Sequence, residues 1–332
     1  LKMIRMSEVE SQEVKWLWYP FIPYGKLTII QGDPGDGKTT LVLNIAAKLS
    51  KGESLDSDMD VQEPVNVIYQ TAEDGLADTV KPRLELAGAD CEKILVIDES
   101  DKSLSMADER LEEALAKTEA KVLILDPIQA YLGGGMDMNR ANEVRPVFRK
   151  LGMIAEKTGC AIVLIGHLNK SSGTQSTYRG LGSIDIMAAV RSLLFIGKVK
   201  KDPTTRVLIH EKSSLAPPGE TMAFKLGDEE GFRWVGAYEI SADDLLDGKE
   251  GKPTETKLQR GTKLIYELLA DGNAVTIREL DEKAKAQGIS QRTMREARSR
   301  MKEELDYQMN EKQENTIRLK KQGRMGDGRI LE

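Results

Sequence analysis

A short glycine-rich segment, Gly32-Asp-Pro-Gly-Asp-Gly-Lys-Thr-Thr40, lies between the apolar run Leu27–Ile30 and a segment with helical periodicity that begins at Leu41. Glycine is costly in chain entropy, so several glycines between a strand and a helix indicate that the backbone passes close to something. The spacing of Gly32, Gly37, Lys38 and Thr39 matches the phosphate-binding loop, or P-loop. In this motif the backbone N–H groups and the helix N-terminus form a cradle for anions. The chain must therefore place a strand directly before this loop and a helix directly after it.

This loop predicts a site for a nucleoside triphosphate, which we take to be ATP. Lys38 is expected to reach the β- and γ-phosphates, and the Thr39 hydroxyl is expected to ligate Mg²⁺. The alternative is a glycine-rich turn with an incidental lysine, which the complete motif between a strand and a helix disfavours. The residues predicted to contact the nucleotide here are Gly32, Asp33, Pro34, Gly35, Asp36, Gly37, Lys38, Thr39 and Thr40.

The composition is that of a globular protein with a sizeable core, because 40% of the 332 residues are hydrophobic and 31% are charged. The formal net charge of -6 gives no overall sign of nucleic-acid binding, so such a site would be a local patch or a pore. We interpret the two cysteines, Cys91 and Cys160, as buried thiols of a reducing compartment. The chain has no apolar run of membrane-spanning length and no apparent signal peptide, so we expect a cytoplasmic protein without a membrane partner.

Short apolar runs alternate with helical patterns through the first two thirds of the chain. Because these runs are continuously apolar, they predict a mostly parallel sheet buried on both faces, which is an α/β fold. Two further runs, Thr205–His210 and Met222–Leu226, predict a hairpin that extends this sheet. The predicted core strands are Leu27–Ile30, Val65–Tyr69, Ile94–Ile97, Val122–Leu125, Ala161–Ile165 and Arg191–Ile196.

The polar stretch near residues 241–261 predicts a linker, which divides the chain into domains. Residues 1–24 form a lead segment, residues 25–240 the ATPase domain, and residues 262–332 a small domain. Three helices are expected in the small domain, at 262–269, 277–286 and 291–305, with Thr276 and Ser290 as N-caps of the last two. Segments 315–320 and 328–331 are expected to pair as a short ribbon.

Two acidic positions follow predicted strands of the ATPase domain. Asp126 ends a buried strand, where a carboxylate would hold the hydration shell of Mg²⁺, although an acid there can also simply cap a helix. Glu73 follows another strand and is the candidate general base that orients or deprotonates the attacking water. Alternatively, Glu73 and Asp74 only cap the next helix, and we expect Asp74 to be that cap.

His167 ends the predicted strand 161–165 and is one of only two histidines in the chain. It is a candidate sensor of the γ-phosphate, and the alternative is a structural histidine. The loop that follows, residues 170–183, is rich in glycine, serine and threonine, and loops of this length are often functional. With Lys170 and Arg179 it is a candidate for phosphate contacts in a central pore, whereas a plain surface loop remains the alternative.

Taken together, these segments resemble RecA-like ATPases, and most closely the hexameric RepA-type plasmid helicases and related phage or mobile-element ATPases. The resemblance covers residues 15 to about 240. It is carried by the P-loop, Ala72-Glu-Asp74, Ile124-Leu-Asp-Pro127, Gly166-His-Leu-Asn-Lys170, and the segment from Arg179-Gly to Arg191.

The resemblance implies a homo-oligomeric, hexameric ring with ATP between subunits and single-stranded DNA in its central pore. It implies that Arg191 is an arginine finger for the neighbouring subunit, that Lys212 acts from the same side, and that Arg83 contacts the base or ribose. From the residues alone, Arg191 can equally pair within its own fold. The chain departs from DnaB-type helicases in showing no large domain before the P-loop, which leaves open whether it loads and unwinds as a main replicative helicase does.

The small domain resembles a winged helix, with residues 291–302 as its recognition helix. Arg292, Arg295 and Lys302 share roughly one face of that helix, which could lie along the phosphate backbone of duplex DNA. A solvated charged face or a protein-contact module is the alternative.

The sequence therefore favours an ATP-driven DNA motor of the helicase or translocase type, acting in replication of a plasmid, phage or integrated element. Two alternatives stay open. One is a recombinase-like ATPase that uses ATP as an assembly switch, and the other is a DNA-binding regulator whose ATP site sets its oligomeric state.

Overall fold

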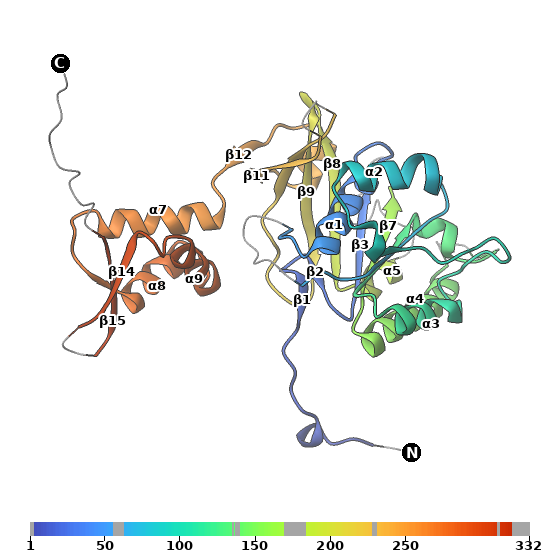
Figure 1. Ribbon diagram of the computed structural model, residues 1–332, viewed down its shortest axis with the longest axis horizontal. Coiled ribbons are helices and arrows are strands. Elements are labelled where there is room, and N and C mark those ends of the chain that lie inside the picture. The colour runs from blue at the N-terminus through green and yellow to red at the C-terminus, as the bar shows by residue number, and fades with distance from the viewer. Residues whose placement is uncertain are drawn as a thin grey trace. The chain divides into compact units, whose positions relative to one another are not determined.

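Figure 1 shows the computed structural model, which describes residues 3–55, 63–134, 136, 140–168, 184–227, 231–310 and 313–320. The chain divides into two compact units, Leu1–Thr254 and Glu255–Glu332. The predicted pore residues Lys170 and Arg179, and the predicted strand 328–331, lie outside the described residues.

The first unit is built on a ten-stranded sheet with the strand order β12-β11-β10-β9-β8-β3-β7-β6-β4-β5. The strands from β8 to β5 in this order run parallel, and β9 to β12 add antiparallel strands beyond β8. The bounds are β3 Leu27–Gly32, β4 Val67–Thr71, β5 Ile94–Leu95, β6 Val122–Asp126, β7 Ala161–His167, β8 Ser192–Val199, β9 Asp202–Ser213, β10 Met222–Lys225, β11 Arg233–Glu239 and β12 Lys252–Thr254.

Helices cover both faces of this sheet (Figure 1). Side chains of α1 and α2 share one apolar cluster with the sheet, and side chains of α3, α4 and α5 share another. The core strands are mostly apolar because both faces are covered, as the sequence predicted, although Thr28, Gln31 and Gln70 are buried polar residues within them. The helix bounds are α1 Lys38–Lys51, α2 Lys81–Leu86, α3 Glu109–Thr118, α4 Ala141–Thr158, α5 Ile184–Ala189 and α6 Ala242–Leu246, with the short turns η1 Met6–Glu8, η2 Leu76–Val80, η3 Cys91–Lys93 and η4 Ile128–Tyr131.

The aromatic residues of the lead segment pack against the antiparallel strands of the sheet. It forms a small two-stranded sheet from β1 (Trp16–Trp18) and β2 (Ile22–Pro23). The ring of Trp18 is fully buried and lies 4.6 Å from Phe21 and 5.7 Å from Trp234 of β11. The predicted hairpin is confirmed, since β9 and β10 pair in antiparallel fashion and join the main sheet.

The described residues of the second unit form three helices and a three-stranded sheet with the order β13-β15-β14. Its core is an apolar cluster of its own, formed by side chains from Leu258 to Ile317. The predicted N-caps are confirmed, because Thr276 accepts a hydrogen bond from the N–H of Glu279 and Ser290 from that of Thr293. The bounds are α7 Lys257–Leu269, α8 Ile277–Ala286, α9 Gln291–Arg300, β13 Val275–Thr276, β14 Leu305–Met309 and β15 Asn315–Leu319.

Four sequence-based expectations about structure need correction. The last helix ends at Arg300 rather than at 305, because Leu305 starts β14. The segment 315–320, which was expected to pair with 328–331, forms β15 and pairs with β13 on one side and β14 on the other. The segment interpreted as a linker, 241–261, instead contains α6, β12 and the first turn of α7. The boundary between the two units, after Thr254, lies within that segment. Cys160 is buried as expected, whereas Cys91 is exposed on η3.

No helix in the described part of the chain is long and apolar enough to cross a membrane.

Candidate nucleotide site

The P-loop connects the end of β3 to the start of α1 at the carboxyl edge of the parallel strands. Gly32 lies so close to β8 that a Cβ atom there would stand 2.3 Å from the carbonyl oxygen of Ile196. Gly37 has φ +89°, and a Cβ atom there would meet Leu226 at 2.4 Å. Only glycine fits both demands, so the motif glycines serve the close approaches that the sequence indicated.

The side chain of Lys38 is folded into the loop. Its ammonium group donates to the carbonyl oxygens of Gly32 at 2.9 Å and Asp33 at 2.8 Å, and the residue is only 4% exposed. Burial lowers the pKa of Lys38, while the nearby carboxylates, first Asp36, raise it. A bound phosphate would compete with these two carbonyl groups for the ammonium protons.

Asp36 is an acid within the anion cradle. Its Oδ2 accepts the N–H of Asp33 at 3.1 Å, which turns the carboxylate into the loop rather than toward solvent. Burial, followed by the charge of Asp33, raises the pKa of Asp36 above its usual range.

Asp126 ends β6 next to the P-loop helix. Its Oδ2 accepts two hydrogen bonds, one from the Thr39 hydroxyl at 2.8 Å and one from the Tyr69 hydroxyl at 3.1 Å. Burial raises the pKa of Asp126, and the two hydroxyl donors and Lys38 oppose that shift. The structure thus brings together the two residues that the sequence proposed for the metal, although they lie far apart in the chain.

These residues fit a magnesium site. In the described part of the chain no three carboxylate, imidazole or thiol groups come together as a metal cage. A hydroxyl beside one carboxylate at a P-loop is the donor set for an ion that keeps several waters and takes its other ligands from substrate phosphates. Thr39 and Asp126 would hold the ion.

Glu73 and His167 lie on the same edge of the sheet. The two side chains face each other at 3.9 Å between Glu73 Oε1 and His167 Nε2, which is beyond hydrogen-bonding distance. The Glu73 side chain is 65% exposed, so a water molecule can reach it. His167 Nδ1 is buried and has no partner among the described residues.

Asp74 does not cap the helix that follows it, and its carboxylate pairs with Arg83 instead. Arg83 forms an ion pair with Asp74 at 3.1 Å, so its guanidinium is engaged by that carboxylate. The N-cap of η2 is Gly75, with no side-chain cap, so the expectation that Asp74 caps this helix is wrong. The Thr71 hydroxyl accepts the N–H groups of Glu73 and Asp74 instead.

Arg191 and Lys212 lie near the amino-terminal ends of the parallel strands, whereas the P-loop lies at their carboxyl ends. Ser192, the first residue of β8, pairs with Thr28 near the start of β3, whereas the P-loop follows Gly32. Four strand residues correspond to about 13 Å, so neither cation reaches the P-loop of its own chain. Lys212 donates to the carbonyl oxygens of Met187 and Val190, and burial together with the charge of Arg191 lowers its pKa.

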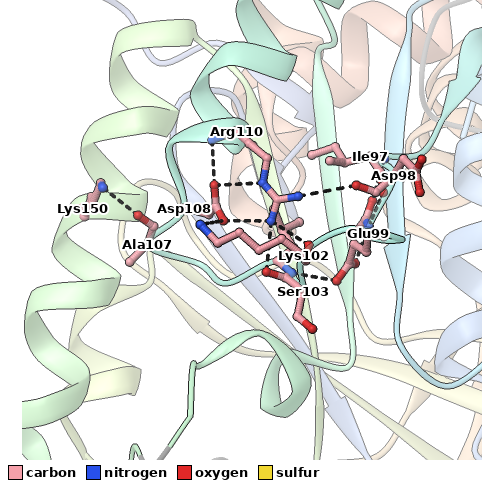
Figure 2. Close-up of polar contacts among 11 residues, drawn as sticks. Ile97, Asp98, Glu99, Lys102, Ser103, Ala107, Asp108, Arg110 and Lys150 are labelled. Atoms are coloured by element: carbon pink, nitrogen blue, oxygen red, sulfur yellow. Dashed lines mark hydrogen bonds and ion pairs between the residues drawn. The ribbon is translucent and has the colours of Figure 1, made fainter.

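A polar loop joins β5 to α3 beside the Asp126 edge, and Figure 2 shows its contacts. Arg110 donates to the carbonyl oxygens of Lys102 and Ser103, each at 3.0 Å, and to the carboxylate of Asp108. Glu99 in this loop accepts a hydrogen bond from Gln70 of β4 at 2.6 Å. The loop is thereby fixed to the strand that also carries Tyr69.

The fold and these groups define a P-loop ATPase of the mixed α/β class. The family model described as "AAA domain" matches residues 2–173, which is just over half of the chain, and the chain belongs to this family.

Similar curated proteins are RecA-like ATPases. DNA repair protein RadA of Halalkalibacterium halodurans is 25% identical over 248 residues, covering 74% of this chain and 49% of RadA. Protein RecA of Clostridioides difficile is 23% identical over 296 residues, covering 80% of this chain and 78% of RecA. The chain thus spans about half the length of RadA (49%). A solved structure of the RadB recombinase superposes with a TM-score of 0.45 at 21% identity, covering 64% of this chain and 91% of that one.

Tyr69 was missed by the sequence analysis. Its hydroxyl meets a residue 57 positions away, and no spacing in the sequence indicates such a contact. The only available signal was a tyrosine within a predicted core strand.

Proposed function

We propose that this protein is an ATP-hydrolysing, oligomeric DNA motor of the helicase or translocase type, related to the RepA-type plasmid helicases. It would act in replication of a plasmid, a phage or an integrated mobile element. ATP would bind at the P-loop, with Lys38 on the β- and γ-phosphates. Glu73 would act as general base, and His167 would sense the γ-phosphate.

Magnesium would neutralise the developing charge on the phosphates when bound. Within the chain, Thr39 and Asp126 would orient that ion, and Glu73 would take the proton of the attacking water. The exposed position of Glu73, beside His167 at the edge of the sheet that carries the P-loop, supports this division of roles.

The position of Arg191 and Lys212 is the single observation that carries the oligomer. Two cations stand side by side, and among the described residues neither side chain has a carboxylate partner. They lie at the amino-terminal ends of the parallel strands, away from the P-loop of their own chain. A pair of this kind favours an anion from outside the chain, and we propose that it is the γ-phosphate bound to the next subunit in a ring. Such an interface is heterologous, because each copy contributes a different half of the site.

DNA would be bound in two places. Single-stranded DNA would pass through the central pore of the ring, contacted by Lys170 and Arg179. The second unit would bind duplex DNA as a winged helix, with α9 as the recognition helix. In support, Arg292 and Arg295 of α9 and Lys302 of the turn after it are all exposed and recur at helical spacing.

The deciding experiment mixes two inactive variants. Glu73→Gln should retain ATP binding and lose hydrolysis by about 10²–10⁴-fold, as expected for removal of a general base. Arg191→Ala should also bind ATP and hydrolyse it poorly, since arginine fingers contribute roughly 10³–10⁵ in rate. Mixed in equal amounts, they should recover about a quarter of the wild-type rate, because a heterologous interface takes one half from each subunit.

Lys38→Ala mixed with Glu73→Gln is the matched control. Both residues belong to the same half of the site, so no mixed interface is complete and no activity should return. If Arg191→Ala and Glu73→Gln co-assemble by light scattering but do not complement each other, Arg191 is no finger and the proposed ring loses its main support.

The similarity to DNA repair protein RadA and to RecA favours a second candidate, a recombinase-like ATPase that uses ATP as an assembly switch. A strand-displacement assay separates the two. A motor requires turnover, whereas a switch works equally well with a non-hydrolysable ATP analogue.

A further inference from the structure

Tyr69 is the one tyrosine of β4, and it points at the carboxylate of Asp126. The residue is fully buried within the apolar cluster under α1. In the sheet Tyr69 pairs with Ile124, which places Asp126 two residues further along the neighbouring strand and on the same face. An aromatic side chain can span this diagonal, and the Tyr69 hydroxyl lies 3.1 Å from Asp126 Oδ2.

The two donors to Asp126 converge on one oxygen. Thr39 and Tyr69 both donate to Oδ2, and no described residue donates to Oδ1. Two hydrogen bonds from different elements, the P-loop helix and β4, fix the rotation of the carboxylate and leave Oδ1 available. Of these two donors, Thr39 has a second proposed task as a metal ligand. Tyr69 therefore supplies the donor to Asp126 that is not itself a proposed metal ligand.

We propose that Tyr69 is a positioning residue for the metal–nucleotide complex, acting by holding the Asp126 carboxylate in the orientation that receives the hydrated ion. This inference rests on the proposed assignment of Thr39 and Asp126 to magnesium. Groups that hydrogen-bond to metal-binding side chains are worth about 10–100-fold in metal affinity or activity. A phenylalanine would fill the same apolar space, so the hydroxyl alone is what the site requires.

Tyr69→Phe tests this, with Tyr131→Phe as a matched control. Tyr131 is also a buried tyrosine, five residues after Asp126 at the end of η4, and its hydroxyl has no partner among the described residues. Manganese serves as the probe, because oxygen ligands accept it in place of magnesium and its binding is visible by electron paramagnetic resonance. Nucleotide affinity is measured separately in EDTA with a fluorescent ATP derivative.

For Tyr69→Phe we expect Mn²⁺ to bind the nucleotide-loaded protein about 10-fold or more weakly, with nucleotide affinity in EDTA unchanged. Tyr131→Phe should match the wild type in both measurements. Mn²⁺ affinity within twofold of the wild type in Tyr69→Phe overturns the inference. An equal loss of nucleotide affinity in EDTA also overturns it, because the role would then be structural. If the wild-type protein binds nucleotide without any metal dependence, the proposed metal assignment itself fails, and Tyr69 has nothing to position.

Discussion

The imidazole of His210 is buried between β8 and the turn that follows β9, and both ring nitrogens have partners. The N–H of Gly219 donates to Nδ1 at 2.9 Å, so the neutral ring carries its proton on Nε2 and donates it to the Ser192 hydroxyl at 3.0 Å. Burial lowers the pKa of His210 from 6.5 to about 4. Ser192 directly follows Arg191, so this ring anchors the side chain of the residue next to the proposed finger.

The first prediction concerns acid stability. Since the pKa of His210 is lower in the folded state, the unfolded state binds the extra proton between pH 6.5 and about 4, and stability falls as the pH falls through that range. At pH 5 this one group should cost about 2 kcal/mol relative to pH 7.5. His210→Gln keeps a donor and an acceptor but cannot titrate, so its free energy of unfolding should lack that loss.

Urea unfolding followed by tryptophan fluorescence is the measurement. All three tryptophans, Trp16, Trp18 and Trp234, belong to the first unit, so the signal reports on that unit alone. An identical pH dependence in the two proteins would mean that His210 does not contribute to acid sensitivity.

Among individual site residues, the sequence predicted only those that belong to a motif. Lys38, Thr39 and Asp126 were predicted because spacing and strand ends carry their chemistry, and the structure brings them together. The Asp74 prediction failed because its carboxylate meets Arg83 of a later turn, a contact that no local pattern encodes. For the same reason Tyr69 could not be predicted.

Among the elements, α8 and α9 of the second unit are joined by a largely buried ion pair. Arg298 and Asp281 lie 2.8 Å apart, and their side chains are 9% and 16% exposed. The pair joins α8 to α9, the helix that also carries Arg292 and Arg295. A second pair of α9, Arg300 with Glu296, lies within one helix and is more exposed.

The second prediction compares the loss of the buried pair, Arg298 with Asp281, with the loss of the more exposed pair, Arg300 with Glu296. Arg298→Met should destabilise α8 and α9 by about 3 kcal/mol, because it leaves the Asp281 carboxylate buried without its partner. Arg300→Met, the matched control, should cost less than about 0.5 kcal/mol. Hydrogen exchange of the α8 and α9 amides in the full chain measures both, and equal protection in the two variants would contradict the assignment.

The end of α9 shows what periodicity cannot decide. Met294, Ala297, Met301 and Leu305 recur at helical spacing and are all buried, so the sequence predicted one helix through residue 305. In the structure the helix stops at Arg300, and Leu305 enters the same core from β14. The pattern therefore predicts which residues are buried, but it does not decide whether each of them lies on a helix or on a strand. The parallel strands were predictable because each is a bounded, mostly apolar run.

In the whole molecule, the two units have separate cores. The apolar clusters of the first unit draw on residues up to Leu246, and that of the second on Leu258 onward. Removing residues 255–332 should therefore leave the first unit folded, with an unchanged tryptophan unfolding transition. Affinity for duplex DNA should fall, with a shallower dependence on salt, because phosphate contacts are lost.

The third prediction needs a variant that removes the proposed DNA contacts without removing the second unit. This is the triple variant Arg292→Ala, Arg295→Ala and Lys302→Ala. In the full chain it should reduce the salt slope by about 3, one for each phosphate contact removed. If neither the truncation nor the triple variant changes the affinity or its salt slope, the second unit binds something other than DNA.

The Arg110 network beside the site has a consequence for how this region can vary between related proteins. Of the groups that Arg110 holds in the loop between β5 and α3, those of Lys102 and Ser103 are main-chain carbonyl oxygens, which every amino acid possesses. The contacts of Arg110 with these two carbonyl oxygens do not depend on the amino acids at positions 102 and 103, although the Lys102 ammonium also lies 3.8 Å from Asp108. Arg110 and its partner Asp108, by contrast, are not interchangeable with other types. Across homologues we expect the loop to keep its path and its length while its side chains drift, with Arg110 and Asp108 replaced together or not at all.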